Sequence, residues 1–157
     1  MAKIKIAVAG CLGRMGQELS KQIINNNKLE FVGGFEHKQH KNINKEFNKV
    51  SNINSSKLID SNPATSIKLA KVLIDFTTPQ SSLENLRIAS QNKTAVIIGT
   101  TGMTDSQKKR VKSYAKKIPI LMSSNMSLGV NLLFNIVKQA SHTLKEADYD
   151  IEIAETH

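Results

Sequence analysis

The sequence AVAGCLGRMG near the N-terminus places three glycines at intervals of three residues, Gly10, Gly13 and Gly16. Leu12 stands where the usual G-x-G-x-x-G pattern has its second glycine. Glycines between a strand and a helix let the backbone approach a pyrophosphate, whose charge the helix N-terminus attracts. Glu36 follows Gly16 by 20 positions, where an acidic residue would accept hydrogen bonds from ribose hydroxyls. The spacing predicts a dinucleotide site; the alternative is an ordinary turn, with Glu36 ending a strand at the surface.

Three further clusters of small and hydroxyl-bearing residues follow apolar runs, namely DFTTP (Asp75–Pro79), GTTG (Gly99–Gly102) and SSNMS (Ser123–Ser127). Open α/β sheets bind ligands at the carboxyl ends of their strands, so we expect the clusters to share one edge. Their hydroxyls and backbone groups suit a nicotinamide riboside and its carboxamide. Any single cluster is explained equally well as a loop, but three beside the glycine turn favour a binding site.

A titratable pair stands at the other end of the chain, in YDIEIAETH. Tyr149, Ile151 and Ile153 alternate with acidic residues, which predicts a strand with one buried face. The alternation continues into Glu155 and His157, so a carboxylate and an imidazole would leave the strand on its apolar side. On this pattern alone, an exposed and inert terminal histidine is the simpler interpretation of His157.

Alternating strands and helices are predicted to position these residues. The expected strands are Ile4–Ala9, Phe31–Phe35, Val72–Phe76, Ala95–Ile98 and a brief one at Ile120–Met122. The expected helices run from Gly13 to about Ile24, from the Thr78-Pro79 start, from the capping box Thr104–Gln107, and from Ser127 along the stripe Val130, Leu133, Phe134, Val137, Ser141 and Leu144. This order predicts an α/β fold, a Rossmann-like parallel sheet with helices on both faces.

Two segments depart from that alternation. Lys, Asn and Ser make up 15 of the 25 residues from 38 to 62, which predicts a long, mobile surface loop with at most one helical turn. The terminal strand alternates where the others are uniformly apolar, so it would belong to another sheet with one exposed face. We therefore expect a dinucleotide-binding domain over residues 1–126, and over 127–157 the first helix and strand of a truncated α+β substrate domain.

The composition, 39% hydrophobic and 22% charged, is typical of globular proteins. The net charge of +9 invites a nucleic-acid interpretation, but the densest basic run, Gln107–Lys117, has apolar residues at helical spacing, so its lysines would form a solvated face. No apolar run is long enough to span a membrane. The single Cys11 fits a reducing compartment, and the apolar stretch before VAGC is too short for a signal peptide. We predict a cytoplasmic protein that binds neither nucleic acid nor membranes, with no metal site.

The motifs GCLGRMG, IDFTTP, IGTTG, SSNMSLGVN and IEIAETH resemble, in the same order, the 4-hydroxy-tetrahydrodipicolinate (dihydrodipicolinate) reductase family of the diaminopimelate route to lysine. The resemblance spans essentially the whole chain, and its terminal segment is the most specific part. It implies an N-terminal Rossmann domain that binds NADH or NADPH. A second domain would bind the small cyclic dicarboxylate substrate and form a homotetramer in the full-length family.

The resemblance also implies roles for individual residues. By position, it places the pyrophosphate at Gly10, Cys11, Leu12, Gly13, Arg14 and Met15, the ribose at Glu36 with His37 beside the 2′-position, and the nicotinamide end at Gly99, Thr100, Thr101, Ser124, Asn125, Met126 and Ser127. His157 matches the first histidine of the family's E-x-H-H-x-x-K segment, the proposed acid. Two positions depart from the family, since relatives commonly carry Arg at His37 and Phe at Met126.

The second histidine, the lysine and a Ser-Gly-Thr substrate loop of the family would all lie beyond residue 157. We therefore expect an N-terminal fragment, which alone should bind cofactor weakly at best and should not reduce substrate. The alternative is a non-catalytic NAD(P)-binding regulatory or redox-sensing module, which would have no need of the IEIAETH segment. A nucleic-acid binder would instead show an affinity that falls steeply with salt.

Overall fold

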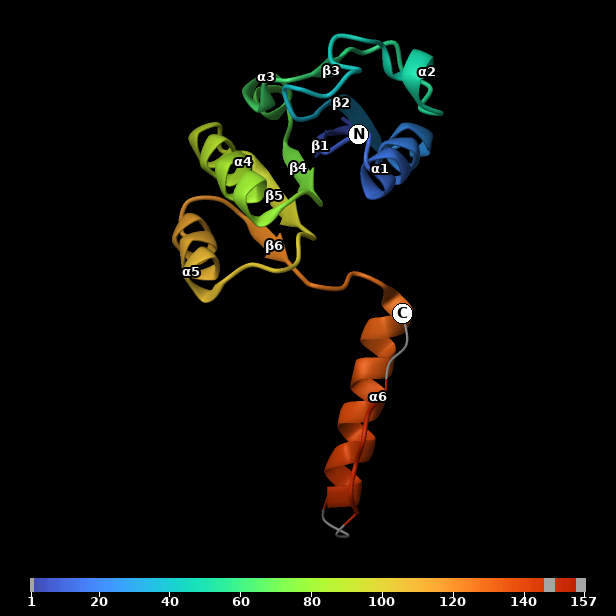
Figure 1. Ribbon diagram of the computed structural model, residues 1–157, viewed down its shortest axis with the longest axis vertical. Coiled ribbons are helices and arrows are strands. Elements are labelled where there is room, and N and C mark those ends of the chain that lie inside the picture. The colour runs from blue at the N-terminus through green and yellow to red at the C-terminus, as the bar shows by residue number, and fades with distance from the viewer. Residues whose placement is uncertain (1, 146–148, 155–157) are drawn as a thin grey trace. The chain divides into compact units, whose positions relative to one another are not determined.

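The computed structural model describes residues 2–145 and 149–154. These residues form two compact units, which divide between Ser124 and Asn125. The first unit holds a six-stranded sheet and five helices, and the second holds one long helix (Figure 1). Each unit is described separately below.

The sheet of the first unit is parallel throughout and has the strand order β3-β2-β1-β4-β5-β6. Its strands are β1 (Ile4–Ala9), β2 (Leu29–Phe35), β3 (Ile59–Asp60), β4 (Val72–Asp75), β5 (Ala95–Ile98) and β6 (Ile120–Met122). The connecting helices are α1 (Arg14–Asn25), α2 (Phe47–Val50), α3 (Pro63–Leu69), α4 (Pro79–Gln91) and α5 (Asp105–Tyr114). The chain order reverses between β1 and β4, which is the Rossmann topology and confirms the predicted fold class.

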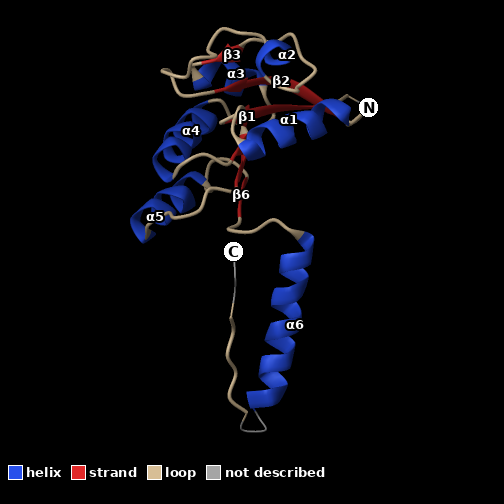
Figure 2. Ribbon diagram, turned by 45° about the vertical axis from the view of Figure 1, so that its right-hand side comes forward, coloured by secondary structure: helices blue, strands red, loops and turns tan. Residues whose placement is uncertain are grey.

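Helices cover both faces of this sheet (Figure 2). Side chains alternate across a strand, so Ala7 and Ala9 of β1 join the core beneath α3, α4 and α5, while Ile6 and Val8 join the core beneath α1 and α2. Both sets are buried, which explains why residues 6–9 are uniformly apolar and show no period of two. The sheet is therefore a rigid frame whose edges carry the loops.

Several predicted elements have the predicted bounds. The strands Ile4–Ala9, Ala95–Ile98 and Ile120–Met122 are confirmed without change. The start of α4 is also confirmed, because Thr78 Oγ1 accepts the N–H of Ser81 and proline follows the cap. The capping box at Thr104 is present in full at the start of α5.

The prediction of a mere surface loop over residues 38–62 is wrong in part. The side chains of Phe47 and Ile53 are fully buried, and the Phe47 ring meets that of Phe31 edge-on, with centroids 5.3 Å apart. The short helix α2 is the one helical turn that was expected, but Ile59 begins a strand that pairs with β2, which was not. The few apolar residues of the segment reach the core singly and do not follow the spacing of a helix or a strand. In a segment that is otherwise polar, the sequence therefore gives no sign that they are buried. Helix α3, which Asn62 caps, follows it and was not predicted.

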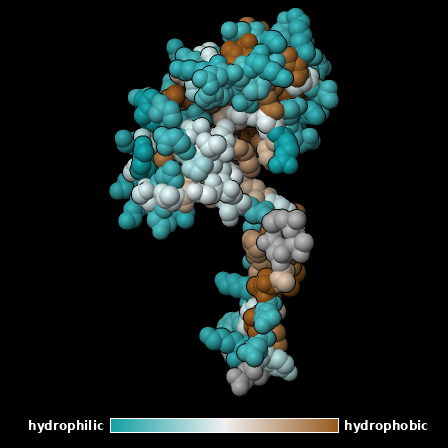
Figure 3. All heavy atoms as spheres, viewed as in Figure 1, coloured by the Kyte–Doolittle hydropathy of each residue, from teal (hydrophilic) through white to brown (hydrophobic). Residues whose placement is uncertain are grey.

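The second unit contains α6 (Leu128–Lys145), with the Ser127 hydroxyl accepting the N–H of Val130 at 3.4 Å as predicted for its cap. None of the residues of α6 is buried, so the expected apolar stripe lies on its surface, where Figure 3 shows hydrophobic side chains. The predicted strand at the end of the chain is absent from residues 149–154. A strand needs a hydrogen-bonding partner, and the described residues of this unit supply none. Among the described residues no helix is long and apolar enough to cross a membrane.

Candidate functional site

Four neighbouring strands of the sheet end level with one another. The last residues of β2 and β1, Phe35 and Ala9, are register partners, and Asp75 pairs with both Ala9 and Ile98. The residues that follow these strands are therefore brought to one edge: Glu36, Gly10, Phe76 and Gly99. The structure thus brings together the glycine turn, the acidic residue and two of the three hydroxyl-rich clusters, as the sequence predicts. Ser123, which begins the third cluster, follows β6 and donates its N–H to the Ile98 carbonyl.

The glycine turn is built by backbone contacts that leave no room for side chains. Gly10 has a φ of +61°, in the left-handed region, and its N–H donates to the carbonyl of Phe35. A Cβ on Gly16 would lie 2.8 Å from the Cα of Cys11 and closer still to the carbonyl oxygen of Gly10. Helix α1 can pack this closely on the turn only because residue 16 is glycine. Gly13 is less constrained: its φ of −67° suits any residue, but a Cβ there would lie 3.2 Å from the carbonyl oxygen of Gly10.

Helix α1 starts without a side-chain cap in the described part of the chain. Gly13 occupies the cap position, and the first turn carries no acidic residue but does carry the exposed Arg14. The first backbone N–H groups of a helix have no acceptor inside it, so those of Arg14 and Met15 remain for a ligand. An anion suits this position, because the helix dipole places partial positive charge there.

The Glu36 side chain reaches back to the glycine turn. Its Oε1 accepts the N–H of Leu12 at 2.7 Å, and the side chain is half-buried. Cys11 points the other way, into the core against Gly34 and Phe47, and burial raises the pKa of its thiol, with the Glu36 carboxylate adding to the effect. Only the backbone of Cys11 is therefore placed to face a ligand. His37 lies at the surface next to Glu36.

A buried polar network ties the end of β4 to that of β5, and sequence reasoning missed it. The carboxylate of Asp75 accepts hydrogen bonds from the N–H and hydroxyl of Thr77 and from the Asn85 side chain. The hydroxyl of Ser82 lies 2.7 Å from that of Thr100 and 3.4 Å from that of Thr77. An acidic residue closing an otherwise apolar run, VLID, was the signal that could have revealed it.

The GTTG segment after β5 presents its residues differently from one another. Gly99 packs against the ring of Phe76, which occupies the space that a side chain at residue 99 would fill, and its N–H donates to the Asp75 carbonyl. Thr100 is buried, and its hydroxyl is hydrogen-bonded to that of Ser82, whereas Thr101 is exposed. Thr101 and the backbone around it are thus the parts of this segment that face solvent at the sheet edge.

The remaining predicted site residues are divided between the two units or lie outside the described residues. Ser124 ends the first unit, whereas Asn125, Met126 and Ser127 belong to the second. There the Asn125 side chain accepts the N–H of Ser127 at 2.8 Å, which orders the residues just before α6. His157 and Glu155 lie outside the described residues.

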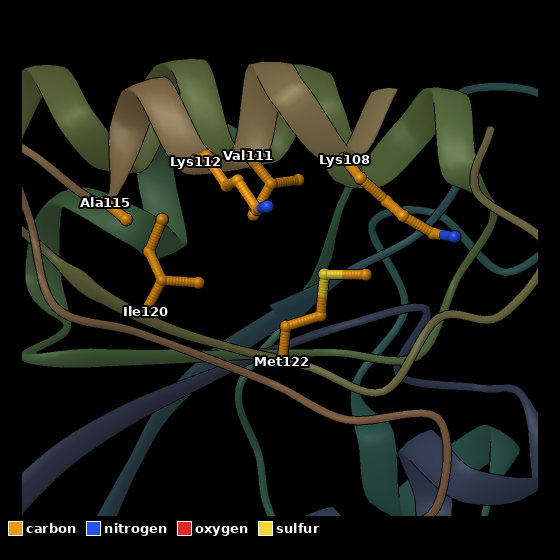
Figure 4. A pocket seen from close by; sticks show the side chains of 6 residues that line it. All are labelled: Lys108, Val111, Lys112, Ala115, Ile120 and Met122. Carbon is orange, nitrogen blue, oxygen red and sulfur yellow. The ribbon is translucent and has the colours of Figure 1, made fainter. Parts of the chain in front are cut away.

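One surface pocket of about 390 Å³ lies apart from the glycine turn, between α5 and β6 (Figure 4). It is lined by Lys108, Val111, Lys112, Ala115, Ile120 and Met122. The lining is mostly aliphatic, and the only charged groups are lysines at its rim. None of the predicted cofactor residues contributes to it.

The comparison with known proteins agrees with the resemblance. The sequence model described as "Dihydrodipicolinate reductase, N-terminus" matches residues 4–126. The chain is 41% identical over 157 residues to the 4-hydroxy-tetrahydrodipicolinate reductase of Pelagibacter ubique (strain HTCC1062), covering 100% of this chain and 57% of the relative. It is 37% identical over 155 residues to that of Syntrophobacter fumaroxidans (strain DSM 10017 / MPOB), covering 98% and 58%.

A solved structure shares the fold: a dipicolinate-bound dihydrodipicolinate reductase from Paenisporosarcina sp. TG-14 superposes with a TM-score of 0.72 at 28% identity, covering 88% of this chain and 54% of that one. The chain thus spans rather less than three fifths of the length of the relatives it matches. Because the family model covers most of the first unit, including the glycine turn and the GTTG segment, the chain belongs to the dihydrodipicolinate reductase family.

Proposed function

We propose that this chain binds NADH or NADPH and forms the cofactor-binding part of a 4-hydroxy-tetrahydrodipicolinate reductase of lysine biosynthesis. The observation that carries the proposal is the meeting, at one sheet edge, of the glycine turn, the uncapped start of α1 and the Glu36 carboxylate. Family membership supplies the reaction class, the reduction of a cyclic dicarboxylate. The nicotinamide ring, when bound, supplies the hydride.

The residues at the glycine turn fit the adenosine and pyrophosphate part of such a cofactor. The N–H groups of Arg14 and Met15 and the Arg14 guanidinium offer hydrogen bonds and positive charge to a pyrophosphate. Gly10 and Gly13 keep side chains out of its path. Glu36 uses one carboxylate oxygen to hold Leu12, so its other oxygen is left to accept hydrogen bonds from the ribose hydroxyls.

The nicotinamide end is assigned to residues after β5 and β6. We place it against Gly99, Thr100 and Thr101 because the GTTG segment lies at the shared edge, and the family pattern alone adds Ser124–Ser127 to this assignment. The proposed proton donor to the substrate is His157. A histidine suits that role because it exchanges its proton near neutral pH. The homotetramer of the family is likewise proposed only for the longer protein.

The test compares binding with turnover. Fluorescence titration should show that this chain binds NADH weakly, whereas a version extended to the length of the relatives should oxidise NADH when 4-hydroxy-tetrahydrodipicolinate is added. In that extended protein, His157→Gln should lower turnover by about 10²–10⁴-fold and leave the NADH affinity nearly unchanged. Binding without any substrate-dependent oxidation would favour the regulatory or redox-sensing module instead. Loss of NADH affinity with normal turnover at saturating cofactor would move His157 to the cofactor site.

A further inference from the structure

Asp75 is a carboxylate buried at the carboxyl end of β4, and the proposed reaction gives it no role. Its side chain is fully buried and accepts three hydrogen bonds, at 2.9 Å and 2.6 Å from Thr77 and at 2.9 Å from Asn85. None of the ion pairs among the described residues includes it. Burying a charge without a cation is costly, so the hydrogen bonds must replace the water that the carboxylate loses. The carboxylate therefore holds its hydrogen-bond donors, Thr77 and Asn85, in fixed positions.

The carboxylate is linked to a chain of hydroxyl groups. The Thr77 hydroxyl donates its proton to Asp75. The Ser82 hydroxyl lies 3.4 Å from that of Thr77 and 2.7 Å from that of Thr100. Through Ser82, the loop after β4 is therefore linked to the loop after β5.

Both loops lie at the edge where the cofactor is proposed to bind. The methyl group of Thr77 lies against Gly10, 2.8 Å from where a Cβ on that glycine would be. Thr100 precedes the exposed Thr101 in the GTTG segment. We propose that Asp75 is a positioning residue, which holds the loops carrying Thr77 and Thr100 in the conformation that receives the nicotinamide end of the cofactor. This inference rests on the proposed function.

Holding the two loops in the binding conformation preorganises the site. Loops that are already ordered lose less conformational entropy when the ligand binds, so the ligand binds more tightly. The network contacts the nicotinamide side of the edge, whereas the α1 start and Glu36 lie on the adenosine side. Disturbing Asp75 should therefore weaken the hold on the nicotinamide end more than that on the adenosine and pyrophosphate groups, which the network meets only through the Thr77 methyl at Gly10. A residue that merely stabilises the fold would affect both ends alike.

The experiment measures the affinities of NADH and of ADP-ribose, which lacks the nicotinamide, by chemical-shift titration of the folded chain. Asp75→Asn keeps the shape of the side chain but turns an amide NH₂ toward groups that already donate. It should weaken NADH binding about tenfold, the effect of losing one good hydrogen bond, and change ADP-ribose affinity less than about twofold. Asp105→Asn, which removes a carboxylate from the exposed first turn of α5, is the matched control and should change neither affinity.

Ser82→Ala provides a second variant, which breaks the hydroxyl chain without touching the carboxylate and decides the matter if Asp75→Asn does not fold. This variant should also lower the affinity for NADH more than that for ADP-ribose, but by a smaller factor than Asp75→Asn does. Equal losses for both ligands, or no loss for either, would overturn the positioning role. If the unmodified chain bound neither ligand, the proposed cofactor site itself would fail, and the inference with it. Binding of ADP-ribose by the unmodified chain separates these two failures.

Discussion

Helices α1 and α5 both follow strands of the same sheet, but they begin in opposite ways. At α5, the Thr104 hydroxyl accepts the N–H of Gln107, the Gln107 side chain accepts the N–H of Thr104, and Asp105 adds a negative charge to the first turn. At α1, Gly13 supplies no side chain and Arg14 brings a positive charge instead. A helix whose own side chains occupy the N–H groups of its first turn does not offer those groups to an anion. The difference marks α1 as the end that a ligand completes.

The largest expected effect comes from making α1 begin like α5. Gly13→Asp places a capping carboxylate where the pyrophosphate is proposed to lie; the φ of −67° suits a side chain, although its Cβ would lie 3.2 Å from the carbonyl oxygen of Gly10. NADH affinity should fall at least about 30-fold, because the carboxylate occupies the N–H groups and repels the phosphates. The melting temperature should change little, since a cap stabilises a helix by about 1 kcal/mol and the close contact offsets part of that gain. Isothermal titration calorimetry measures the NADH affinity, and thermal denaturation measures the melting temperature.

The control for that change is Thr104→Asp at α5, which exchanges one capping residue for another at a helix start that is not proposed to contact the cofactor. It should alter neither the NADH affinity nor the melting temperature appreciably. A normal NADH affinity in folded Gly13→Asp would show that the pyrophosphate does not lie at α1.

Gly16→Ala should sharpen the comparison through stability. Its Cβ would lie closer than 3.0 Å to backbone atoms of the glycine turn, which cannot move aside as a flexible side chain would. We expect a loss of about 2–3 kcal/mol in the free energy of unfolding, measured by urea denaturation. Gly102→Ala is the informative counterpart. Nothing lies within 4 Å of its Cβ position, so any cost there comes only from its φ of +78°.

The choice between NADH and NADPH depends on the two residues after β2. Glu36 should repel a 2′-phosphate, and His37 is a poorer phosphate partner than an arginine, so we expect NADH to bind at least as well as NADPH. Calorimetric titration with both cofactors checks this. A marked preference for NADPH would contradict it.

The smallest effect is expected at α5. Thr104→Ala removes the hydroxyl that accepts the Gln107 N–H and should cost about 1 kcal/mol of unfolding free energy. NADH affinity should not change, since this turn satisfies itself and is not proposed to meet the cofactor. A parallel loss of affinity would mean that the start of α5 belongs to the site.

The sequence predicted the parts of the fold where composition and geometry coincide. The buried strand Ala95–Ile98 is apolar on both faces, and the α4 and α5 starts carry their own caps, so both were recognisable. Residues 38–62 were misjudged because isolated residues such as Phe47 reach the core without any period. The prediction of a terminal strand was wrong for another reason. Alternating apolar residues indicate that a segment can pair as a strand, but they do not identify the partner strand that it requires.

The candidate site was predicted unevenly for a similar reason. Spacing alone placed Glu36 beside the glycine turn, and the Leu12 contact agrees with that placement. Spacing could not reveal that Asp75 and Thr100 are joined through Ser82, because that network depends on side chains that meet only in the folded sheet. Nor could it show that the side chain of Cys11 is buried in the core.

The most direct test of the central claim is a chemical-shift map of the nitrogen-labelled chain titrated with NADH. We expect the backbone amides of Gly13, Arg14, Met15 and Glu36 to shift together and to saturate with a single dissociation constant. The amides at the start of α5, from Thr104 to Gln107, should remain unshifted throughout. Saturable shifts at α5 with an unperturbed α1, or the absence of any saturable shift at α1, would contradict the claim that α1 is the end completed by the cofactor.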